Sequence, residues 1–262
     1  MHEECLICGA PLLYLKEDKE MSCALCGKKE KSKTLCAKGH YVCSACHMQG
    51  LDSIISLCMS EESKSPVHIL EKMMSLPFCH MHGPEHHIMV GAALLTAYQN
   101  AGGQLNLAAS LSELFSRARQ VPGGACGFWG ACGAGISSGM FISIVTGATP
   151  LAEKPWGLAN QMTAASLAAI GQTGGPRCCK RNSYTAIREA VKFAKEHLGI
   201  EMAWQDVRCT RSEMNNQCIG SRCPFQSNQL LFRLNLLPAM PRFPIPALLC
   251  NDISFALPAD TP

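Results

Sequence analysis

The sequence predicts a mainly α-helical protein with a small zinc-finger module, of ribbon or cross-braced type, at its amino terminus. Apolar residues recur at helical spacing between residues 85 and 198, cysteines form close pairs near the start, and no alternating strand pattern of comparable strength is found. We therefore expect four zones. They are a double zinc-binding module (1–47), a helical connector (48–78), a helical Cys/His-rich main domain (79–225) and a proline-rich, poorly ordered tail (226–262).

Four segments of the main domain have the periodicity of helices. They are residues 85–100, 107–121, 157–170 and 183–198, and each is followed by a glycine that suits a helix end. Residues 133–151 are long enough and poor enough in charge to raise the question of a membrane span. Their glycine, serine and alanine content instead favours a buried helix and loop, packed closely against neighbouring segments.

The first 47 residues contain eight potential metal ligands in four pairs. The pairs are Cys5 with Cys8, Cys23 with Cys26, Cys36 with His40, and Cys43 with Cys46. Eight such ligands make two tetrahedral sites, so we predict two zinc ions. Sequential pairing would give a ribbon and a knuckle, whereas pairing first with third and second with fourth would give a cross-braced module. Residues 39–46 resemble the central part of RING-type fingers, which favours cross-bracing without implying ubiquitin chemistry.

Cysteine usage also predicts the compartment and the partners. The chain has 17 cysteines, an odd number in metal-ligand spacings, and its first five residues lack the pattern of a signal peptide. We expect a reducing cytoplasm in which thiolates serve metals. A net charge of +3 gives no indication of a nucleic-acid partner, and no membrane association is expected. The zinc module is expected to bind a protein partner.

Residues 79–87 combine a cysteine, a glutamate and four histidines. Pro84 suits the first turn of the helix that follows. We assign His82, Glu85, His86 and His87 as candidate catalytic residues, acting as ligands, as a general base or as both on a small-molecule or sulfur-containing substrate. The alternative is structural, with histidines that cap the helix or line a polar interface.

Seven further cysteines suggest an iron–sulfur centre; the alternatives are a redox or sulfur-carrying set of thiols and ordinary buried cysteines. Cys126 and Cys132 lie in glycine-rich backbone whose N–H groups can approach sulfur, and Cys223-Pro224 resembles the ending of some ferredoxin motifs. Basic neighbours favour thiolate at Cys178 and Cys179, which we assign to catalysis. We expect all seven cysteines to converge on one pocket. The predicted cofactor ligands are Cys126, Cys132, Cys209, Cys218 and Cys223.

Five motifs together resemble a known but uncharacterised family. They are GHYVCSACH at 39–47, HGPEHH at 82–87, GGACGFWGACGAG at 123–135, GGPRCCKR at 174–181 and QCIGSRCP at 217–224. They resemble cysteine-rich proteins of anaerobic bacteria and archaea, classed as a domain of unknown function, over roughly residues 5–225. The resemblance implies an anaerobic setting, which suits oxygen-sensitive clusters. The segment after Phe225 does not fit this resemblance.

Two classes of function follow from these residues. The first is an iron–sulfur redox or sulfur-transfer enzyme of anaerobic metabolism that carries a zinc finger. The second is a non-enzymatic factor that handles metal or sulfur, or a zinc-finger adaptor. The sequence contains neither a Walker A motif nor the Cys-x3-Cys-x2-Cys signature of radical enzymes that use S-adenosylmethionine.

Removal of the residues after Phe225 is expected to leave bound metal and melting temperature nearly unchanged, because a proline-rich segment without periodicity adds little cooperative structure. Elemental analysis and thermal denaturation of the full-length and truncated chains provide the measurement. A large loss of stability on truncation would show that the tail packs against the rest of the protein.

Overall fold

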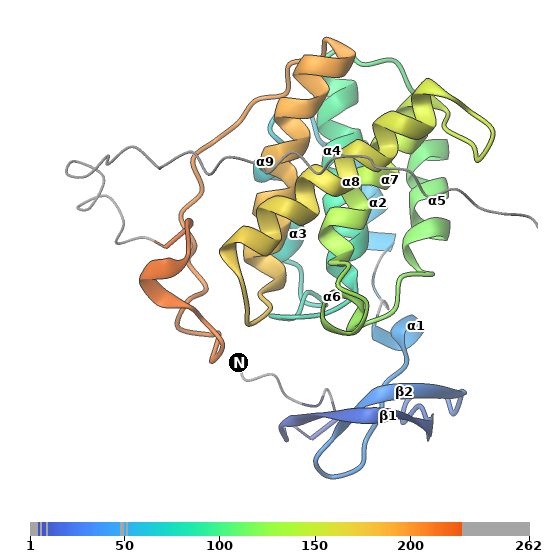
Figure 1. The fold of residues 1–262 in the computed structure, drawn as a ribbon, viewed down its shortest axis with the longest axis vertical. Coiled ribbons are helices and arrows are strands. Elements are labelled where there is room, and N and C mark those ends of the chain that lie inside the picture. Colours follow the sequence, from blue (N-terminus) through green and yellow to red (C-terminus); the bar gives the residue numbers. More distant parts are fainter. Residues whose placement is uncertain (1–4, 6, 9, 48–49, 51, 227–262) are drawn as a thin grey trace, which may run out of the picture. The chain divides into compact units, whose positions relative to one another are not determined.

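The computed structural model describes residues 5, 7–8, 10–47, 50 and 52–226 (Figure 1). Its elements are β1 (Leu12–Ser22), β2 (Lys29–Cys36), α1 (Ser44–His47), α2 (Asp52–Ser60), α3 (Pro66–Met74), α4 (Glu85–Asn100), α5 (Leu107–Ala118), α6 (Ala125–Phe128), α7 (Gly133–Thr146), α8 (Lys154–Thr173), α9 (Cys179–Leu198) and a 3₁₀ turn (Gly220–Arg222). The prediction of a mostly helical fold is confirmed. The predicted tail lies, from residue 227 onward, outside the described residues.

Helix α4 is the centre of the helical body. It contacts α2, α3, α5, α7 and α9, and every residue from Glu85 to Tyr98 except His87 is buried. A helix that is enclosed on all sides belongs to a core rather than to a surface. The polar side chains of Glu85 and His86 in its first turn therefore need partners inside the protein.

Small residues bring α7 close to α8. Ser138 Oγ lies 2.8 Å from Ser166 Oγ, and a Cβ atom added at Gly139 would lie only 1.8 Å from Thr163 Oγ1. The segment of low charge at 133–151 thus contains a helix of 14 residues that packs within the body. None of the helices in the described part of the chain is long and apolar enough to cross a membrane.

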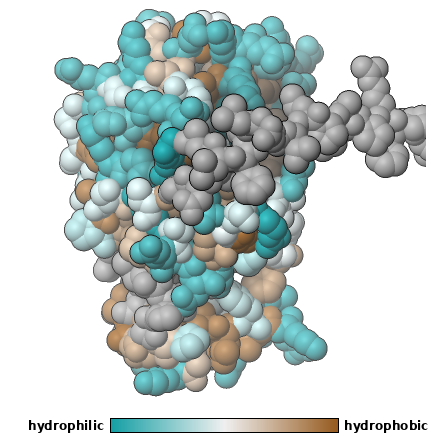
Figure 2. Space-filling view, turned by 90° about the vertical axis from the view of Figure 1, so that its left-hand side faces the viewer, coloured by the Kyte–Doolittle hydropathy of each residue, from teal (hydrophilic) through white to brown (hydrophobic). Residues whose placement is uncertain are grey.

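Helix α9 is buried on all sides at its start and amphipathic further on. Residues 180–187 are all buried, whereas Lys192, Lys195 and Glu196 are exposed. The first two turns of α9 therefore carry charged side chains into the interior, and the last turns meet solvent. The molecular surface shown in Figure 2 is a mixture of hydrophilic and apolar residues.

The amino-terminal strands form an antiparallel hairpin. Leu12 pairs with Cys36 and Ser22 with Lys29, and the register shifts between Tyr14 and Lys19. These two strands were not predicted. The side chains of β1 are mostly exposed and those of β2 mostly half-buried, and neither strand alternates apolar with polar residues, so the periodicity that reveals a half-buried strand is absent.

Gly139→Ala is expected to destabilise the protein by roughly 1–3 kcal/mol, because the new methyl group must displace Thr163 where α7 meets α8. Gly157→Ala in α8 is the matched control, since a Cβ atom there would meet nothing within 4 Å. It should be neutral or stabilise by up to about 1 kcal/mol through helix propensity. Chemical denaturation of both variants tests this, and equal effects would contradict the close approach.

Candidate metal centres

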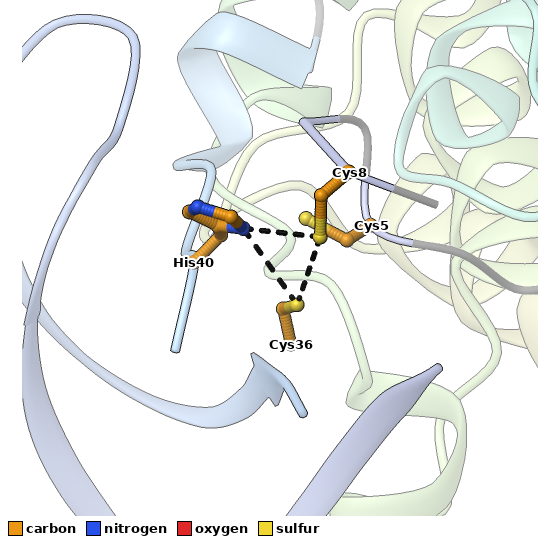
Figure 3. A group of neighbouring side chains, drawn as sticks. All are labelled: Cys5, Cys8, Cys36 and His40. Atoms are coloured by element: carbon orange, nitrogen blue, oxygen red, sulfur yellow. Dashed lines mark hydrogen bonds between the residues drawn. The ribbon is translucent and has the colours of Figure 1, made fainter. Parts of the chain in front are cut away.

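The first group of potential ligands in the module is Cys5, Cys8, Cys36 and His40, whose ligand atoms all lie within 4.8 Å of one another. The Sγ atoms of Cys8 and Cys36 are 3.5 Å apart, and His40 Nδ1 lies 3.2 Å from Cys8 Sγ (Figure 3). In a tetrahedral zinc site with Zn–S bonds of about 2.3 Å, sulfur atoms are about 3.8 Å apart. The group therefore fits one tetrahedral ion.

The second group is Cys23, Cys26, Cys43 and Cys46, again within 4.8 Å of one another. Cys26 Sγ and Cys43 Sγ are 3.6 Å apart. The hairpin separates the two groups, because Cys36 pairs with the first residue of β1 and Cys23 follows its last residue. The first pair of ligands thus joins the third and the second joins the fourth, which is the cross-braced arrangement.

One thiol in each group is predisposed to ionise. Burial raises the pKa of Cys23, but hydrogen bonds from the backbone N–H groups of Cys43, Cys26 and Leu25 outweigh it and lower the pKa to about 6. Cys36 behaves in the same way, with the N–H of Lys38 as its main donor, and its pKa is also about 6. Because cysteine binds metal as thiolate, these N–H groups favour metal binding.

A third group lies inside the helical body and comprises Cys79, Glu85 and His86. Cys79 Sγ is 3.9 Å from His86 Nε2 and accepts a hydrogen bond from Lys180 Nζ at 2.9 Å. His80 donates its backbone N–H to Glu85 Oε1 at 3.0 Å, while Glu85 Oε2 is buried without a hydrogen-bond partner. Burial and the charge of Lys180 lower the pKa of His86 to about 3, so its imidazole is neutral at neutral pH.

The other two candidate histidines lie elsewhere. His82 accepts the backbone N–H of Cys179 at Nδ1 (3.4 Å), and its Nε2 lies 3.2 Å from Asn215 Oδ1. His87 Nδ1 donates to Val121 O at 3.3 Å, and burial lowers the pKa of this histidine. Glu85 and His86 therefore belong to the group around Cys79, whereas His82 and His87 both line one larger cavity.

Four of the seven remaining cysteines line one small cavity: Cys178, Cys209, Cys218 and Cys223. Several N–H groups point at their sulfurs. Cys178 Sγ accepts from the backbone of Arg181 at 3.5 Å and from Asn215 Nδ2 at 3.6 Å. Cys209 Sγ accepts from the backbone of Arg211 at 3.4 Å. Three distant segments, at 178, 209 and 218–223, thus meet at one place.

Backbone pairing between residue 209 and residues 225–226 fixes one side of this cavity. The backbone N–H of Cys209 donates to Phe225 O at 2.6 Å, and Cys209 forms a parallel bridge with Gln226. The ring of Phe225 stacks edge-on against Tyr184, with 5.3 Å between centroids. The loop that carries three of the four cysteines is thereby anchored on α9.

The other three cysteines do not line this cavity. Cys126 and Cys132 border a different cavity that Arg177 and Asn182 also line, and Cys179 faces a further cavity with Cys126. The charge of Cys132 adds to burial in raising the pKa of both Cys126 and Cys179, so the three thiols are neighbours. The expectation of one pocket for all seven is not met, because adjacent residues at a helix start point in different directions.

The sequence reasoning gave no role at these sites to Cys79, Asn182 and Asn215, and it used Lys180 and Arg181 only as basic neighbours of Cys178 and Cys179. All of these residues except Cys79 are 6% exposed or less. Cys79 lies within the histidine-rich segment and could have been included on that ground. The role of the others depends on contacts between residues far apart in the chain, which no local motif reveals.

Fold and sites together define a mostly helical, cysteine-rich protein whose cysteine and histidine clusters could hold metal ions. The chain belongs to a family of unknown function (DUF5714), whose model matches residues 54–226. The matched range contains the histidine-rich segment and all seven cysteines of the predicted iron–sulfur set. No curated protein and no solved structure matches the chain.

The cross-braced grouping predicts which pairs of substitutions remove one metal ion and which disturb both. Cys8→Ser with Cys36→Ser falls in one group and should leave one of two ions bound. Cys8→Ser with Cys23→Ser falls in both groups and should lower both occupancies. Elemental analysis of the purified chains provides the measurement. The reverse outcome would mean that the four pairs bind sequentially.

Proposed function

We propose that this protein is an iron–sulfur protein with a double zinc finger, and that its iron–sulfur centre serves a redox or sulfur-transfer reaction. The observation that carries the proposal is the convergence of Cys178, Cys209, Cys218 and Cys223 on one cavity. Four cysteine thiolates are the usual ligands of a [4Fe–4S] cluster, which supplies one-electron chemistry when bound.

The spacing of these thiols favours a cluster over a single ion. Among the described residues, the groups whose ligand atoms lie within 4.8 Å of one another are the two in the module and the one around Cys79. The four thiols around the cavity are spread more widely than that. Ligand sulfurs of a cubane cluster are roughly 6–7 Å apart, because each binds a different iron atom.

The electrostatics of the cavity also favour an anionic occupant. Arg181 lines the cavity and is only 3% exposed, and its guanidinium donates to Gly174 O, Pro176 O and Asn182 Oδ1, which are all uncharged. A buried cation is costly without a negative partner. A [4Fe–4S] cluster with four thiolates carries a net charge of about −2 in its oxidised form and would supply that partner.

The module is proposed to bind two zinc ions and to recruit a protein partner. Its buried clusters consist of little more than the ligands themselves: Cys5, Ala10 and Cys36 in one, and Cys23, Cys43 and Cys46 in the other. So small an apolar core does not stabilise a fold of this size, so metal binding must contribute most of the stability. The reducing cytoplasm that both centres require is proposed as the location.

The enzymatic role is proposed because polar side chains lie next to the cluster ligands. Asn215 contacts Cys178 Sγ through Nδ2 and His82 Nε2 through Oδ1, so a histidine lies one residue away from a cluster ligand. That histidine could exchange a proton with a small or sulfur-containing substrate. Cys218, in contrast, is exposed, which favours the second candidate function, transfer of the cluster to another protein.

The test is iron and acid-labile sulfide in protein purified without oxygen. Cys209→Ser with Cys218→Ser should lose about four iron atoms and the matching sulfide per chain, while its zinc content stays unchanged. Cys58→Ser is the matched control, because Cys58 is buried in the helical core, away from the cavity. Iron content that is equal in both variants would exclude this cavity as a cluster site.

A further inference from the structure

Three of the seven cysteines predicted to form one iron–sulfur pocket have no role in the proposed function: Cys126, Cys132 and Cys179. They come from separate elements. Cys126 lies in α6, Cys132 precedes the first residue of α7, and Cys179 is the first residue of α9. Cys126 lines a cavity with Cys132 and another with Cys179. The folding of three segments around this place brings together the type of ligand that iron–sulfur clusters use.

A neutral imidazole completes a set of four. His87 lines the cavity that Cys126 and Cys179 face, and its Nδ1 proton is bound to Val121 O. The lone pair is therefore on Nε2, as in most metal-binding histidines, whose other nitrogen donates to a carbonyl or carboxylate. The ring lies flat against Gly133, where a Cβ atom would come within 2.3 Å of Nε2.

Gly133 thus allows the imidazole to lie directly against the start of α7. Any side chain at this position would push the ring away from the start of α7, and Cys132 is the residue directly before it. The close approach is specific, because a Cβ atom at Gly127, in the same glycine-rich segment, would meet nothing within 4 Å. Gly133 therefore serves the position of His87, whereas Gly127 does not.

The thiols of this second set accept hydrogen bonds from N–H groups, as do the thiols that line the first cavity. Asn182 Nδ2 donates to Cys132 Sγ at 3.3 Å, and the backbone N–H of Gly83 donates to the thiol of Cys179. The positive charge of Arg177 acts on both Cys126 and Cys179. Donors and positive charge favour thiolate ligands and an anionic cluster.

We propose that Cys126, Cys132, Cys179 and His87 hold a second iron–sulfur cluster, bound by three thiolates and one imidazole. The inference rests on the proposed function in one respect, that the chain is an iron–sulfur protein. Cys178 and Cys179 are then ligands of two different clusters, much as the cysteines of one sequence motif are shared between both clusters in two-cluster ferredoxins. The two clusters lie next to each other and form a path for single electrons.

Paired substitutions in the full chain, purified without oxygen, test the second site. Cys126→Ser with Cys132→Ser should lose about half of the iron and sulfide of the unaltered protein, and Cys209→Ser with Cys218→Ser should lose the other half. Cys58→Ser should lose none. Zinc content and the far-ultraviolet circular dichroism of each variant report whether the fold is retained, so that loss through unfolding is recognised.

The imidazole ligand has a separate test. Pulsed electron paramagnetic resonance of the reduced Cys209→Ser, Cys218→Ser variant should show coupling to a histidine nitrogen, and the coupling should disappear in the same variant with His87→Ala. Gly133→Ala should weaken it by displacing the ring, with Gly127→Ala as the control. The absence of coupling while iron is retained would exclude His87 as the ligand.

The outcomes separate this inference from the proposed function. Iron that is lost only on substitution at Cys209 and Cys218 would overturn the second cluster and leave the first in place. Iron that is lost only on substitution at Cys126 and Cys132 would overturn the first and keep the second. Zinc in place of iron at the second site, or no iron in the unaltered protein, would overturn the inference.

Discussion

Burial of the start of α9 is the constraint on which the sites of the helical body depend. Successive residues of a helix point about 100° apart, so four consecutive side chains face four directions. Cys178 faces the cavity of four thiols, and Cys179 faces the opposite set. Lys180 reaches Cys79, and Arg181 reaches the carbonyls at 174 and 176. One helical turn thus connects every candidate centre of the body.

The charges at this turn explain why thiols gather around it. Lys180 and Arg181 are 2% and 3% exposed, and the positive end of the helix dipole adds to their charge. Glu85 is the nearby buried carboxylate on the side of Lys180, and its pKa is lowered because hydrogen bonds, the strongest of them from His80, outweigh the effect of its burial. No carboxylate contacts Arg181 among the described residues, so thiolates are the groups available to balance it.

The sequence predicted those features that depend on local spacing. The helix at 85–100 and the eight ligands of the module follow from periodicity and from pairs of ligands two or three residues apart. The spacing within a pair does not determine which two pairs form one group. The cross-braced grouping became visible only in the structure, where the hairpin of β1 and β2 separates the two groups. The same limit applies to Lys180 and Cys79, whose contact spans 101 residues. Local spacing also could not predict that the seven cysteines divide between two places, because Cys178 and Cys179 face different cavities from one helical turn.

The two kinds of centre also differ in how their charge is balanced. The potential ligands of each group in the module lie within 4.8 Å of one another, a spacing that suits a single ion whose charge would offset the thiolates, and the lysines nearby, such as Lys28 and Lys38, are exposed. The four thiols around the small cavity are spread more widely, and Cys178 and Cys223 among them are buried, so water balances the charge of these two poorly. Buried cations and N–H donors must balance the charge of these thiolates instead. Arg181 and Asn215 supply a positive charge and an N–H donor at the cavity, and this is the electrostatic basis on which an anionic cluster is proposed there in preference to a single cation.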